Sequence, residues 1–158
     1  NRYNHAFHPG YEERIQPVSF ETNNPHMRDR SCSMEQSKVY FTDMRCKIGT
    51  SLLEKMDKLM LAAGIEQINF QNAFVAIKIH FGEPGNLAFL RPNFAKTVAD
   101  RVKKLGGLPF LTDANTLSVV RRHNALVHMD AAFENGFPPF STGCQVIIAD
   151  GLNGPDEV

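Results

Sequence analysis

Residues 74–86, FVAIKIHFGEPGN, decide the fold that this sequence predicts. The first eight are mostly β-branched or aromatic, which favours a β-strand, and they lead directly into a loop that contains two glycines and a proline. Because side chains alternate along a strand, Val75 and Ile77 point to one face, whereas Lys78 and His80 share the other. The stretch therefore predicts a strand that carries polar side chains to its carboxyl end.

Three more short apolar strands are expected, at residues 39–42, 108–112 and 146–149. Helices are expected between them, with clear start and stop signals. Ser51 and Glu54 form a capping box before a helix that ends at Gly64. Pro92 suits the first position of a second helix, which ends at Gly106. A third helix is expected over residues 124–135; its inward side chains are predicted to be Ala125, Leu126, Met129, Ala132 and Phe133.

The resulting order, β-α-β-α-β-α-β, predicts an α/β fold. Strands that are almost wholly apolar are typical of a parallel sheet covered by helices. We therefore expect a three-layer, Rossmann-like, mostly parallel sheet in a domain at residues 37–158, with the carboxyl ends of all four strands at one edge. Residues 1–36 have no sustained apolar period and are expected to be an irregular tail, either a natural extension or an artificial addition to the protein.

Composition excludes several classes of protein. The 158 residues contain 17 Lys and Arg against 17 Asp and Glu, so a nucleic-acid partner is not expected. No apolar run reaches the roughly 18 residues of a membrane span, and a cytoplasmic protein without a membrane partner is expected. The cysteines Cys32, Cys46 and Cys144 are odd in number and lack a C-x-x-C motif, so they encode neither a disulfide framework nor a closed metal site.

Every polar cluster in the regular region follows a strand, and in α/β sheets ligands bind at that edge. His80 and Glu83 are candidate acid/base residues or ligands of a divalent metal, and Lys78 is a candidate partner of an anion or a carboxylate. The candidates for binding a ligand or cofactor are Asn86, Arg91, Asp113, Asn115 and Asp150, and Arg121 and Arg122 could join Arg91 in clamping a carboxylate or phosphate. The alternative is structural: loops are polar, Asp and Asn favour strand ends, a backbone carbonyl can satisfy His80, and Lys78 can extend to water.

Four runs resemble the prokaryotic uncharacterised iron-sulfur-centre proteins, the family of domain of unknown function 362. They are VAIKIHFGEPGN at 75–86, RP at 91–92, FLTDANTL at 110–117 and TGCQVIIADGL at 142–152. The resemblance implies a cytoplasmic α/β domain, of which this chain is the amino-terminal portion. It also implies ferredoxin-like [4Fe-4S] clusters only in a longer form of the protein, because the cysteines of this chain cannot replace the cluster-binding ones.

The resulting hypothesis is the α/β portion of an iron-sulfur redox or electron-transfer protein that binds a small anionic or metal-associated ligand at the strand ends. Two alternatives stay open: a non-catalytic module that docks against the missing half or another protein, and a hydrolase or transferase whose divalent metal is held by His80 and Glu83. The sequence does not decide whether the protein is an enzyme. An exposed sheet edge also makes pairing between copies an expected form of association.

Overall fold

The computed structural model describes residues 16–18, 38–117 and 120–153. These residues fall into two compact units, Asn1–Ala63 and Gly64–Val158. The predicted domain boundary at residue 36 stays a prediction, because only residues 16–18 of the expected tail are described. None of the helices in the described part of the chain has the length and apolar character needed to cross a bilayer.

The first unit contains a two-stranded ribbon and a helix. Strand β1 (Gln16–Val18) pairs antiparallel with β2 (Val39–Phe41). Helix α1 (Leu52–Ala62) starts as predicted: the Ser51 hydroxyl accepts the Glu54 amide at 3.1 Å, and the Glu54 carboxylate accepts the Ser51 amide at 2.7 Å. The predicted helix stop is also confirmed, since Gly64 follows the C-cap with a φ of 88°.

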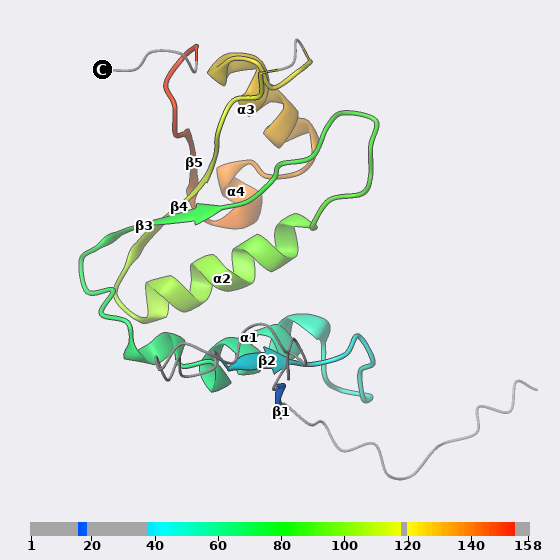
Figure 1. The fold of residues 1–158 in the computed structure, drawn as a ribbon, viewed down its shortest axis with the longest axis vertical. Helices are drawn as coiled ribbons and strands as arrows, with labels where there is room; N and C mark the ends of the chain where they lie inside the picture. Colours follow the sequence, from blue (N-terminus) through cyan, green and yellow to red (C-terminus); the bar gives the residue numbers. More distant parts are fainter. Residues whose placement is uncertain (1–15, 19–37, 118–119, 154–158) are drawn as a thin grey trace, which may run out of the picture. The chain divides into compact units, whose positions relative to one another are not determined.

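The second unit contains the parallel sheet, whose first strand is formed by the beginning of the 74–86 stretch (Figure 1). After the short helix η2 (Ile65–Gln67), strand β3 (Phe74–Lys78) is followed by α2 (Pro92–Lys104) and β4 (Leu108–Asp113). Helices α3 (Ala125–Glu134) and α4 (Pro139–Thr142) then lead to β5 (Gln145–Ile148). The strands lie in the order β3-β4-β5 and are all parallel, with Lys78 opposite Thr112 and Asp113 opposite Ile148.

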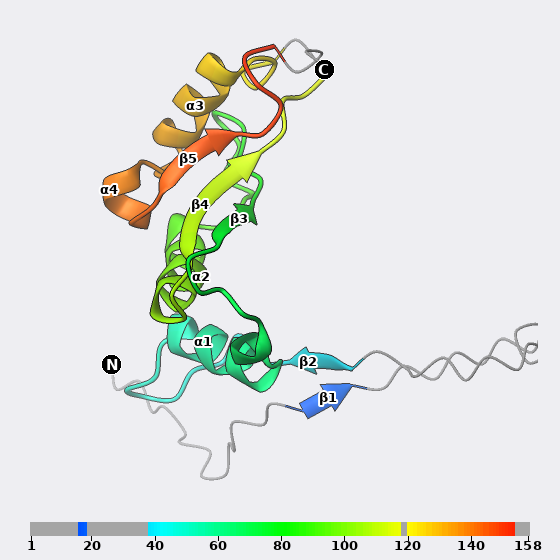
Figure 2. The same ribbon diagram turned by 90° about the vertical axis from the view of Figure 1, so that its left-hand side faces the viewer.

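The α/β prediction is confirmed, but the full Rossmann-like order is not. Strand β2 forms where the sequence predicts a strand, yet it pairs with β1 instead of joining the parallel sheet. The predicted helix cover on both faces is not seen in the described residues of this unit, where α2, α3 and α4 lie on one side of the sheet (Figure 2). The strand order gives the reason. Each new strand lies next to the previous one and always on the same side of it. Right-handed crossovers then place the successive helices on the same face of the sheet.

The core lies between the sheet and these helices. Helix α2 packs against β3, β4 and α4, and α3 packs against β5. Phe81, Leu111 and Phe137 are fully buried at the centre, with Ala95 and Ala99 of α2 against them. On the opposite face, Phe74 is 83% exposed, and Leu108 and Ile147 are each 51% exposed. The predicted alternation along β3 is therefore confirmed, although the strand ends at Lys78, three residues earlier than predicted.

Helix α3 corrects one prediction about its inward face. Leu126 is 68% exposed and Phe133 is 38% exposed, whereas His128 and Ala131 are fully buried. Asn124 caps the helix, accepting the amides of Leu126 and Val127 at 3.1 Å each. The apolar side chains are spread around this helix, so periodicity alone did not identify the face that packs. The buried face carries a histidine, which places an imidazole beside the end of β4.

Candidate functional site

Asp113, the last residue of β4, is the centre of a polar cluster at the carboxyl edge of the sheet. Its side chain is only 5% exposed. Oδ1 lies 2.7 Å from the ammonium of Lys78 and accepts the Ala114 amide at 2.9 Å. Oδ2 faces two other groups, Nη1 of Arg122 at 3.6 Å and Nε2 of His128 at 3.5 Å. One buried carboxylate thus faces three basic side chains from three parts of the unit.

These neighbours determine the charge of Asp113. Burial raises the pKa of the Asp113 carboxyl, but the side chains of His128 and Lys78 and the Ala114 amide lower it by more, and the result lies far below the usual range. Asp113 is therefore ionised at neutral pH. A buried carboxylate needs such partners, because a charge removed from water without them is strongly destabilising.

Asn115 connects the end of β4 with the segment after β5. Its backbone amide donates to both carboxylate oxygens of Asp150 at 2.9 Å, and its side-chain Nδ2 donates to the carbonyl of Gly151 at 3.3 Å. Its Oδ1 lies 3.2 Å from Nδ1 of His128. Asn115 and Asp150 therefore lie at the same edge as Asp113, as the sequence predicts for polar residues that follow parallel strands.

Glu83 joins the cluster through an ion pair with Nε of Arg122. Arg122 is 12% exposed and connects the loop after β3 with Asp113. Lys78 differs from these groups because its side chain is 66% exposed. We call this cluster the strand-end site; it consists of Lys78, Glu83, Asp113, Asn115, Arg122, His128 and Asp150.

Three predicted site residues are not members of the strand-end site. His80 is exposed, and its Nδ1 accepts the Gly82 amide at 3.0 Å. Asn86 belongs to a turn with Glu83, and its Oδ1 accepts the Ala88 amide at 2.9 Å. Arg91 is the exposed N-cap residue of α2. The roles predicted for these three residues stay predictions.

A divalent metal at His80 and Glu83 also stays a prediction. Within the described ranges, no group of three or more His, Cys, Asp or Glu side chains is arranged to hold a metal ion. Glu83 is paired with Arg122, so its carboxylate would have to exchange that partner for a cation. Of the cysteines, Cys46 is exposed and Cys144 is buried, where burial raises the pKa of its thiol, whereas Cys32 lies outside the described residues.

His128 is the site residue that sequence reasoning missed. It lies three residues after Ala125 and four before Ala132, both of which were predicted to face inward. Helical spacing therefore places an imidazole on the buried face of α3, which is the signal that could have found it. Its ring packs edge-on against Phe81, with 5.8 Å between centroids and 80° between planes.

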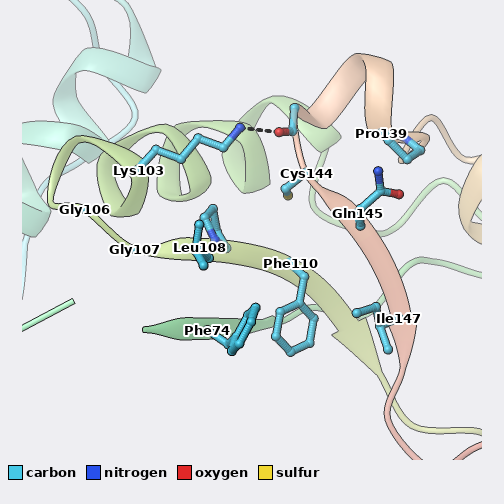
Figure 3. Close-up of a pocket in the computed structure, with 12 residues that line it drawn as sticks. Phe74, Lys103, Gly106, Gly107, Leu108, Phe110, Pro139, Cys144, Gln145 and Ile147 are labelled. Atoms are coloured by element: carbon cyan, nitrogen blue, oxygen red, sulfur yellow. Dashed lines mark hydrogen bonds between the residues drawn. The ribbon is translucent and has the colours of Figure 1, made fainter. Parts of the chain in front are cut away.

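A separate groove of about 740 Å³ lies at the amino ends of the strands and on the helix-free face of the sheet (Figure 3). Phe74, Leu108, Phe110 and Ile147 supply much of its apolar lining. At one end Lys103 donates a hydrogen bond to the carbonyl of Gly143. None of the strand-end residues lines this groove, so it is distinct from the polar cluster around Asp113.

Comparison with known proteins identifies the family of this chain. No curated protein and no solved structure matches it. The sequence model of one family, the domain of unknown function DUF362, matches residues 75–158. This match covers more than half of the 158 residues and includes the parallel sheet, apart from Phe74, and all members of the strand-end site. The chain therefore belongs to the DUF362 family.

Proposed function

We propose that the strand-end site binds a small anionic ligand, and that this chain is the α/β part of an iron-sulfur redox or electron-transfer protein. The observation that carries the first half is the position of Lys78. Its ammonium contacts the buried carboxylate of Asp113 at 2.7 Å while the side chain stays 66% exposed. A cation is therefore held at a fixed point of the sheet edge with one side open to water.

An ammonium has three donors, and the contact with Asp113 accounts for one of them. The others are available to a carboxylate or phosphate from solution, because an exposed lysine pairs with such groups as a compact point charge. Arg122 has a different role in this proposal. It is largely buried and paired with Glu83 and Asp113, so it holds the loop after β3 against the end of β4.

The test measures binding of inorganic phosphate and of acetate by calorimetric titration at low ionic strength. We expect the wild-type protein to bind at least one of them, and Lys78→Met to bind it at least tenfold more weakly. Lys104→Met is the matched control, because Lys104 is also exposed but lies in the last turn of α2. Equal binding by the wild type and Lys78→Met would refute the assignment of Lys78.

The iron-sulfur half of the proposal is supported by the sequence resemblance. A [4Fe-4S] cluster takes four cysteine ligands, and this chain has three cysteines, one of them buried in the core. The residues present do not fit such a cluster, so the proposal places it in a longer form of the protein. Iron and sulfide analysis, with ultraviolet-visible absorption, of the full gene product purified without oxygen tests this. A colourless, iron-free product would rule the cluster out.

A further inference from the structure

The atoms that face the two ring nitrogens of His128 indicate whether the ring is charged. The ring is fully buried, so its hydrogen-bonding groups depend on protein partners. Nδ1 faces Oδ1 of Asn115 at 3.2 Å, and Nε2 faces Oδ2 of Asp113 at 3.5 Å. Each ring nitrogen thus faces a side-chain oxygen.

Asn115 fixes the hydrogen on Nδ1. Its side-chain amide is oriented by the bond from Nδ2 to the carbonyl of Gly151, which can only accept. Oδ1 of Asn115 is therefore the atom that faces His128, and it is also an acceptor. Nδ1 must supply the hydrogen, since two acceptors do not attract each other.

Asp113 then decides the state of Nε2. Its Oδ1 accepts from Lys78 and Ala114, which keeps the carboxylate ionised. In a neutral ring with its hydrogen on Nδ1, the lone pair of Nε2 would point at this carboxylate inside the protein, where repulsion is poorly screened. A second proton on Nε2 turns the repulsion into an attraction between opposite charges, with 3.5 Å between Nε2 and Oδ2. We infer that His128 is buried as an imidazolium, and that its charge offsets the surplus negative charge of the strand-end site, so that the site can accept an anion.

The effect of the His128 charge on anion binding follows from the balance of charge in the site, and it rests on the function proposed above. Without the imidazolium, the site has two cations and three carboxylates, a net charge of −1 that would repel an anion. These groups are Lys78, Arg122, Glu83, Asp113 and Asp150. A charged ring makes the site neutral, so an incoming anion meets the exposed ammonium of Lys78 without a surplus of negative charge.

The first experiment is nuclear magnetic resonance of the protein labelled with ¹⁵N in histidine, at pH 7. The signals of His128 are assigned from their absence in His128→Gln. We expect both ring nitrogens of His128 to be protonated in the wild type. In Asp113→Asn we expect a neutral ring, since the carboxylate that stabilises the charge is gone. If His128→Gln fails to fold, the His128 signals are assigned in the wild type from the contact of its ring with Phe81. A neutral His128 ring in the wild type would overturn the inference.

Phosphate binding tests the consequence for the site. We expect His128→Gln to bind inorganic phosphate at least tenfold more weakly than the wild type, and His123→Gln, which changes an exposed histidine, to bind it equally well. A purely structural His128 would change the melting temperature and leave phosphate affinity unchanged, which would contradict the inference. If the wild type binds no phosphate or acetate, the proposed function fails, and the charge of the ring is still decided by resonance.

Discussion

The ammonium of Lys78 lies 2.7 Å from Oδ1 of Asp113, and the two side chains differ more than tenfold in exposure, at 66% and 5%. The contact joins the last residues of two adjacent parallel strands. Because one partner is buried and the other is open to water, removing the one or the other has different consequences for stability. This asymmetry separates the structural role of Asp113 from the binding role proposed for Lys78.

Asp113→Asn should destabilise the protein strongly. It leaves Lys78, Arg122 and His128 without the carboxylate they share, and loss of one partner from a buried ion pair costs about 3 to 5 kcal/mol. Lys78→Met should cost less than about 1 kcal/mol, because an exposed ammonium contributes little. Urea unfolding at pH 7 measures both free energies. If the two variants lose the same free energy of unfolding, the buried carboxylate is no more important for stability than the exposed ammonium, which contradicts the prediction.

The stability of the wild type should decrease in acid because of Asp113. Although burial raises the pKa of its carboxyl, the contacts with His128, Lys78 and Ala114 hold the pKa well below the usual range. The group therefore stabilises the fold above the unfolded-state pKa of about 4, and this stabilisation is lost as the pH falls below that value.

Urea unfolding from pH 7 down to pH 2 checks this expectation. The free energy of unfolding should fall with a smaller slope in Asp113→Asn than in the wild type, because the variant lacks the titrating group. Asp130→Asn changes an exposed carboxylate of α3 and serves as the control. Parallel curves for the wild type and Asp113→Asn would contradict the prediction.

Neighbouring arginines offer a matched comparison. Arg122 is 12% exposed and bonded to Glu83, whereas Arg121 is 47% exposed and bonded to Glu134 at 2.6 and 2.9 Å. Arg122→Ala should lower the free energy of unfolding by about 2 kcal/mol, since it leaves Asp113 and Glu83 without a shared partner. Arg121→Ala should have no measurable effect, because a solvated ion pair contributes little. A larger loss in Arg121→Ala would mean that burial does not decide the strength of these pairs.

Local signals made part of the fold predictable. The capping box at Ser51, Pro92 at the start of α2, and the glycines Gly64 and Gly106 after α1 and α2 each act within one turn of the chain, so sequence alone located them. The sheet depended on contacts far along the chain. Nothing local to residues 39–42 tells whether that strand joins β3 or pairs with residues 16–18, which is why the predicted four-strand order was not confirmed.

The candidate site, like the fold, could be predicted only in part. Lys78, Asp113, Asn115 and Asp150 could be grouped from sequence, because parallel strands bring their carboxyl ends to one edge. His80 was placed with them on the assumption that the strand continued to residue 81. The strand ends at Lys78, and the following loop turns the imidazole of His80 toward its own backbone. His128 reaches the site from a helix, and no rule about strand ends could find it.

Two glycines of the loop after β3 have the same backbone conformation in different surroundings. Gly82 has a φ of +84° and Gly85 a φ of +87°. A Cβ at Gly82 would lie 2.6 Å from Cδ1 of Phe89 and 2.7 Å from Nδ2 of Asn135, whereas a Cβ at Gly85 would meet nothing within 4 Å. The two positions therefore separate backbone strain from crowding.

Gly85→Ala should lower the free energy of unfolding by about 1 kcal/mol, the cost of a left-handed backbone for alanine. Gly82→Ala should cost about 3 kcal/mol, because the ring of Phe89 and the amide of Asn135 must move as well. Urea unfolding measures both costs. If the two variants are equally stable, the loop accommodates a methyl group at Gly82 by moving, and the packing of Phe89 is not tight.

The two described cysteines should differ in reactivity with a thiol reagent. Cys46 is exposed, whereas Cys144 is 7% exposed, and burial raises the pKa of its thiol, which lowers the fraction of reactive thiolate. Alkylation of the native protein at pH 8, followed by peptide mass spectrometry, should label Cys46 within minutes and Cys144 at least a hundredfold more slowly. In urea, where both thiols are exposed, the rates should converge. Rapid labelling of Cys144 in the native protein would show that the end of β5 opens, because the thiol lies inside the core that packs β5 against the helices.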